Sequence, residues 1–113
     1  MKGIWKGNTH AVHIGHMPHR RATREGHNFG GPLELQITIK EQEHTMFMGR
    51  LDINGRTETL IGSINPDSRS GIALDDDGQI IFTLSGSEKM DACYSHMDEN
   101  VKATACFTLV RTK

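Results

Sequence analysis

Short segments of alternating apolar and polar residues follow one another along most of this chain, and turn-forming residues separate them. In LELQITIK (residues 33–40), Leu and Ile alternate with Glu, Gln, Thr and Lys, so an extended chain would present one apolar and one polar face. Asn54-Gly55 separates two later segments, and this pair favours a tight hairpin because both residues accept positive φ angles. The pattern predicts antiparallel strands joined by hairpins.

The turn residues set the limits of eight expected strands. No segment shows the 3.6-residue period of an amphipathic helix. The expected strands are GIWKGNTHAVHI (3–14), LELQITIK (33–40), TMFMGRLD (45–52), TETLIGSI (57–64), SGIALD (70–75), QIIFTL (79–84), KMDACYSH (89–96) and VKATACFTLVR (101–111).

Eight hairpin-connected strands fit either an up-and-down antiparallel barrel or a sandwich. The barrel is favoured, because pairing the first strand with the last removes both exposed edges. The polar EQEH (41–44) is expected to form a turn, and residues 16–32 are expected to form a long loop between the first two strands. The whole chain, 1–113, has the length of a single domain.

Charge and hydropathy exclude some classes of partner. Lys and Arg total 13 against 14 Asp and Glu, so no overall field favours nucleic acid or an anionic membrane, and neither is expected as a partner. No apolar run approaches the roughly 20 residues of a membrane-spanning helix, and the opening MKGIWKG lacks the apolar stretch of a signal peptide. No motif indicates a bound cofactor, so none is expected.

A family resemblance begins with Gly3-Ile4-Trp5. This triplet resembles the Gly-x-Trp pattern that opens the first strand of calycins, the superfamily of lipocalins, fatty-acid-binding proteins and avidins. In that superfamily a basic residue of the last strand packs over the tryptophan, which implies this role for Arg111. Residues 62–111 also resemble a family of small bacterial calycin-like barrels without an assigned activity.

The resemblance implies a lipocalin-like or avidin-like barrel, with departures. Avidins line their biotin pocket with several tryptophans, whereas this chain has only Trp5, so biotin is not expected as the ligand. The chain is also shorter than typical lipocalins and lacks their C-terminal helix, which implies a small cavity.

Two cysteines lie on the last two expected strands. A hairpin centred near Glu99 and Asn100 would place Cys93 directly opposite Cys106, and the alternation puts both on the face away from the bulkier apolar residues. A disulfide would indicate a periplasmic or secreted protein, and two free thiols would indicate a cytoplasmic one. The sequence leaves both alternatives open.

Five of the seven histidines lie within residues 8–27. A metal site needs three or four ligands that converge on one point. The candidate ligands are His10, His16 and His19. On an extended strand His10 and His16 point to one side and His13 to the other, so the histidines of this segment cannot all converge while it stays extended. The alternatives are a solvated polar loop and a lid across the barrel mouth.

As a lid, this loop would be basic. Arg20 and Arg24 could hold a carboxylate or phosphate headgroup, because guanidinium groups bind such anions with two parallel hydrogen bonds.

Aromatic residues are expected to line the barrel interior. They are Phe82, Tyr94 and Phe107, together with Ile80. A buried phenol needs a hydrogen-bond partner, so Tyr94 contacts either a ligand, a water molecule or a neighbouring core residue. The three acids at 75–77 precede a glycine and are interpreted as a solvated turn rather than a calcium site.

The favoured function is therefore a barrel that binds a small, partly apolar ligand, with an anionic headgroup as an option. One alternative is a cofactor-free or metal-assisted isomerase or cyclase that uses Tyr94 or a loop histidine for proton transfer. Another is a histidine-rich metal-binding protein. Two or three titratable side chains at one point of the cavity would favour catalysis. The alternation does not decide the inward faces of the third to fifth strands, because either parity leaves mixed residues inside. An outward apolar set such as Met46 and Met48 would favour a homo-oligomer.

Overall fold

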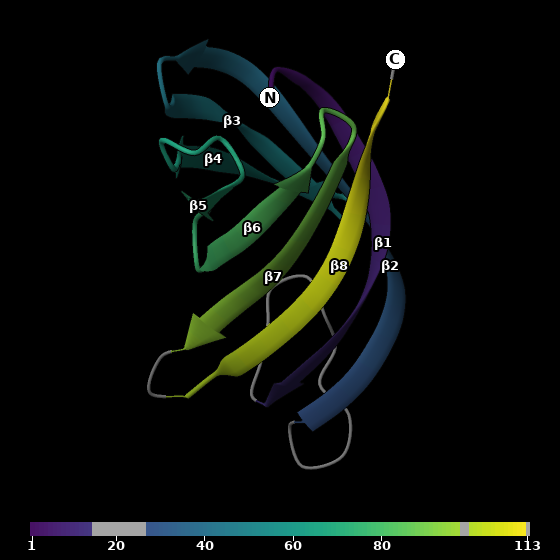
Figure 1. Cartoon of the computed structure of the whole chain (residues 1–113). Coiled ribbons are helices and arrows are strands. Elements are labelled where there is room, and N and C mark those ends of the chain that lie inside the picture. The colour runs from purple at the N-terminus through teal and green to yellow at the C-terminus, as the bar shows by residue number, and fades with distance from the viewer. Residues whose placement is uncertain (15–26, 98–99, 113) are drawn as a thin grey trace.

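The protein is an eight-stranded antiparallel barrel. The computed structural model describes residues 1–14, 27–97 and 100–112, and it has each strand hydrogen-bonded to the next, with β1 pairing with β8 to close the barrel (Figure 1). The strands are β1 (Gly3–Ile14), β2 (His27–Glu43), β3 (Met46–Ile53), β4 (Arg56–Ile64), β5 (Ser70–Leu74), β6 (Gln79–Ser85), β7 (Lys89–Met97) and β8 (Lys102–Thr112). The predicted all-β, up-and-down barrel is confirmed.

The second strand differs most from its prediction. β2 begins at His27, so residues 27–32 belong to the strand and not to a loop. Gly31 and Pro32 lie opposite the single residue His10 in a bulge, between the pairs Thr9 with Leu33 and Ala11 with Gly30. Glycine and proline weaken a regular strand, but a bulge accommodates both.

The far end of β2 was also predicted wrongly. Glu41, Gln42 and Glu43 continue the strand and pair with β3, and the turn consists of His44 and Thr45 alone. The polar composition of residues 41–44 indicates a turn. Polar composition alone, however, does not distinguish a loop from a strand whose side chains are exposed.

Alternate residues of every strand face inward and form the core. Trp5, Leu60, Ile80 and Leu109 are almost completely buried. In one half of the barrel the packing is tight: a Cβ at Gly62 would lie 2.2 Å from Cζ of Phe47, so only glycine fits beside that ring.

The two ends of the barrel differ. At the end that carries both termini (Figure 1), the guanidinium of Arg111 lies 6.0 Å from the centre of the Trp5 ring, and Nε1 of Trp5 donates a hydrogen bond to the carbonyl oxygen of Met1 at 2.9 Å. The opposite end carries the Asn54-Gly55 turn and the turn between β5 and β6. The paired residues Ile14 and His27 also lie there.

Cys93 and Cys106 form a disulfide between β7 and β8. They are direct register partners, and both are exposed on the outer surface, as the alternation predicted. The described residues contain no helix of the length and hydropathy needed to cross a bilayer.

Candidate functional site

The barrel interior contains a cavity of about 40 Å³ toward the end opposite the termini. This volume accommodates a few water molecules. Most of its wall is apolar and includes Leu35, Ile80, Ala105 and Phe107. Three titratable side chains complete the wall: Glu58, Asp75 and Tyr94.

Glu58 is the most deeply buried acid of the site. It lies on the inward face of β4 and is only 2% exposed. Its Oε1 accepts a hydrogen bond from the N–H of Asp76 at 3.1 Å, while Oε2 lies 3.7 Å from Nε of the half-exposed Arg56. Burial, reinforced by the nearby carboxylates of Asp75 and Asp77, raises the pKa of Glu58 to about 7. Glu58 therefore exchanges its proton near neutral pH.

Asp75 directly follows β5, and its side chain is turned inward toward the cavity. Its Oδ1 accepts hydrogen bonds from the N–H groups of Asp77 at 3.0 Å and Gly78 at 2.7 Å, which fixes the turn into β6. Its Oδ2 is buried and accepts no hydrogen bond from the part of the chain that the structure describes. Burial is the main cause that raises the pKa of Asp75.

The sequence predicts a solvated turn for the three acids at 75–77, and this prediction is wrong for two of them. Asp76 is exposed, but Asp75 and Asp77 are partly buried. The reason is strand parity, because Asp75 continues the inward face that includes Ala73.

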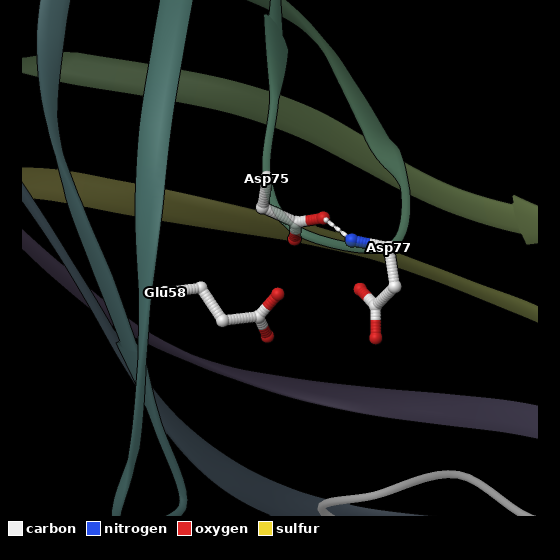
Figure 2. A group of neighbouring side chains, drawn as sticks. All are labelled: Glu58, Asp75 and Asp77. Atoms are coloured by element: carbon white, nitrogen blue, oxygen red, sulfur yellow. Dashed lines mark hydrogen bonds between the residues drawn. The ribbon is translucent and has the colours of Figure 1, made fainter.

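Three carboxylates converge at this point. One carboxylate oxygen from each of Glu58, Asp75 and Asp77 lies within 4.8 Å of the other two. Figure 2 shows the Glu58 side chain extending from β4 toward the two aspartates of the β5–β6 turn. Like charges at this separation repel one another, so the cluster favours bound protons or a positively charged neighbour. Carboxylate oxygens are also the ligands of hard divalent cations.

Two side chains of β7 contact Asp77. The O–H of Tyr94 donates to Oδ1 of Asp77 at 3.0 Å, and Nδ1 of His96 contacts the carbonyl oxygen of Asp77. Burial and the neighbouring carboxylates raise the pKa of Tyr94, so it remains a neutral donor. The partner of the Tyr94 phenol is thus a residue of the barrel.

Some of the aromatic and aliphatic residues expected inside the barrel line the cavity, and the others pack in the tightly filled half of the barrel near Phe47. Tyr94, Phe107 and Ile80 line the cavity. Phe82 also faces inward, but it packs edge-on against Phe47, with their ring centres 6.0 Å apart, and does not reach the cavity wall.

The basic loop and its histidines are described only in part. Arg20, Arg24, His16 and His19 lie outside the described residues. His10 is exposed on the outer surface beside Cys106, whereas His13 is buried inside the barrel, so these two side chains do not converge.

Glu58 is a residue of the site that was not predicted, although the sequence contains a signal for it. In TETLIGSI, Glu58 has the same parity as Leu60 and Ile64, so a charged residue occupies a core position of the strand. A charge in such a position is costly unless it is paired, hydrogen-bonded or protonated. It therefore marks a candidate site.

No family model matches this chain, and no match was found among curated proteins or solved structures. The candidate site is therefore defined by its geometry alone.

Proposed function

We propose that the protein is a calycin-like barrel that binds a small molecule in its interior, at the end where Glu58, Asp75 and Tyr94 face the cavity. The observation that carries this proposal is a cavity with an apolar wall on one side and carboxylates on the other. Ligand sites in proteins combine these features, because apolar contacts supply affinity and a few polar groups fix orientation.

The chemistry of the wall favours a ligand with a positively charged or hydrogen-bond-donating group. Oδ2 of Asp75 is a buried acceptor that a ligand N–H or O–H would satisfy. The cavity of about 40 Å³ limits the buried part of such a ligand to a few non-hydrogen atoms. An anionic headgroup would instead depend on Arg20 and Arg24.

The disulfide supports a proposal about the cellular compartment in which the protein acts. Exposed, bonded cysteines persist in oxidising compartments, so a periplasmic or secreted protein fits the Cys93–Cys106 bond.

Native mass spectrometry of untagged protein tests the proposal. We expect a bound mass that leaves on denaturation, and we expect Ala105→Leu to abolish it because the larger side chain fills the cavity. Thr83→Leu is the control, since it adds the same side chain on the outer surface of β6. A bound mass that Ala105→Leu retains would place the ligand elsewhere, and protein that never carries one would argue against the proposal.

Catalysis by acid–base chemistry is a second candidate. It is favoured by the convergence of Glu58, Asp75 and Tyr94 on one cavity and by the pKa of about 7 at Glu58. Glu58 suits proton transfer better than Tyr94, whose raised pKa and hydrogen bond to Asp77 keep it protonated. If the recovered ligand is converted by wild-type protein, Glu58→Gln should stop the conversion without abolishing binding. Metal binding by His10, His16 and His19 stays an alternative, and two of these residues, His16 and His19, lie outside the described part of the chain.

A further inference from the structure

The outer surface of β3 to β6 carries a patch of large apolar side chains, although the outside of an antiparallel barrel is ordinarily polar. Six large apolar side chains on these strands are between 42% and 57% exposed. We call this surface the β3–β6 face, and it consists of Met46, Met48, Ile61, Ile72, Leu74 and Ile81.

The strand register makes the β3–β6 face continuous. Met48 pairs with Ile61, and Ile61 pairs with Leu74. In the adjacent row Ile72 pairs with Ile81, and the small side chain of Ser63 separates Ile72 from Met46. Direct cross-strand partners have Cβ atoms about 4.5–5.5 Å apart, so these side chains touch across three pairs of strands.

The charged residues lie around this face. On β2, Glu41 pairs with Met48 and Glu43 with Met46, so two carboxylates border one edge. Arg50 follows Met48 by two positions on the same outward side of β3. An apolar centre with a polar rim is the arrangement found in stable protein–protein interfaces.

We propose that the β3–β6 face is a homodimer interface, in which two copies of this chain pack face to face about a twofold axis. The exposed areas support a second copy as the occupant. At roughly 100 Å² for each half-exposed side chain of this size, the six present on the order of 600 Å², the upper limit for a patch on a typical monomer. Two copies together would bury about 1,200 Å², the lower limit for specific, stable complexes.

The chemistry of the face also favours a second copy. An isologous interface brings the same patch from both chains together, and this patch places no unpaired charge at its centre. Sheets pack face to face through interdigitating side chains, and flexible methionines such as Met46 and Met48 adapt to such packing. A membrane surface fits less well, because Glu41 and Glu43 would be repelled by anionic lipids.

Sedimentation velocity of the full chain tests this proposal. We expect wild-type protein to sediment at twice the chain mass of 12.6 kDa. Ile61→Lys should raise the dissociation constant at least about tenfold, because it buries a charge at the centre of the interface. Val110→Lys on β8 is the matched control, since Val110 is 54% exposed and Ile61 47%, and it should remain dimeric.

Ile81→Lys provides a second patch variant if Ile61→Lys does not fold, and thermal unfolding verifies the fold of each. A monomeric wild type at about 100 μM would overturn the proposal, because the proposal is of a stable dimer, and a dissociation constant above that concentration describes only a weak, transient contact. The proposal would also be overturned if the dimer persisted in both Ile61→Lys and Ile81→Lys. Equal disruption of the dimer by the control Val110→Lys would overturn it too. Binding of wild-type monomers to phosphatidylglycerol vesicles would assign the face to a membrane instead.

Discussion

Tyr94 donates its phenolic hydrogen to Oδ1 of Asp77 at 3.0 Å, which links β7 to the turn between β5 and β6. This bond holds the side chain of Asp77, whose carboxylate lies within 4.8 Å of those of Glu58 and Asp75. The position of Asp77 therefore depends on a residue from another strand, and the bond can be tested directly.

Tyr94→Phe should lower the free energy of unfolding by about 1–3 kcal/mol, because it leaves a partly buried carboxylate without its donor. Urea unfolding measures the change. Thr57→Val is the control: Thr57 donates to Asp52 at 2.6 Å at the surface, where water replaces the lost bond, so its effect should be clearly smaller. Equal losses in the two variants would show that the Tyr94 bond has no special role.

Glu58→Gln should change how stability depends on pH. The folded-state pKa of Glu58 is about 7 and its ordinary value is 4.5, so between these values the folded state binds more protons than the unfolded state. Stability therefore falls as pH rises from about 4.5 to 7, and this carboxyl accounts for a loss on the order of 3 kcal/mol.

Because glutamine is neutral, Glu58→Gln should be more stable than wild type at pH 8 and nearly equal to it at pH 4.5. The measurement is the free energy of unfolding across this range. Glu43→Gln removes an exposed carboxylate of β2 and should leave the pH curve close to that of wild type. A Glu58→Gln curve parallel to the wild-type curve would contradict the assigned pKa.

Replacing both bonded cysteines, Cys93→Ala with Cys106→Ala, should lower stability by about 2–4 kcal/mol. The bond closes a loop with a sequence separation of 13, and cross-links of this length restrict the unfolded chain to that extent. Chemical denaturation measures the loss, and treating wild-type protein with a reductant should reproduce it. The double variant has no disulfide to reduce, so the reductant should not change its stability. If it does, the effect of the reductant on wild-type protein does not measure the disulfide.

Arg111→Ala should lower stability by about 1–2 kcal/mol, since it removes the cation over the Trp5 ring and the hydrogen bond from Nη2 of Arg111 to the carbonyl oxygen of Lys2. Tryptophan fluorescence monitors the unfolding, because Trp5 is the only tryptophan. Lys6→Ala, an exposed cation on the same strand as Trp5, should change stability little. A similar loss of stability in Arg111→Ala and Lys6→Ala would show that the change in net charge, and not the contacts of Arg111, causes the effect.

The strand pattern was largely predictable because its signals are local. Alternation and turn residues placed β1 at its observed limits, and they located the turn at Asn54-Gly55, where both residues adopt positive φ angles. The same signals failed at Gly31-Pro32, where a bulge keeps residues within a strand that ordinarily interrupt one. The inward faces of β3 to β5 were ambiguous, because residues such as Met48 and Ile61 make the outer face apolar as well.

The sequence by itself determined the number of strands and placed Cys93 opposite Cys106, because both follow from the two-residue period and the length of a hairpin. It left open whether the two sulfur atoms are bonded, and it favoured barrel closure without deciding it. The tertiary structure decided the site. Glu58 and Asp75 are far apart in sequence, and only the register of β4 against β5, together with barrel closure, places both carboxylates at one cavity. Burial there raises their pKa values. The parity of Glu58 indicates an inward side chain, but the degree of burial and the raised pKa depend on all the surrounding strands.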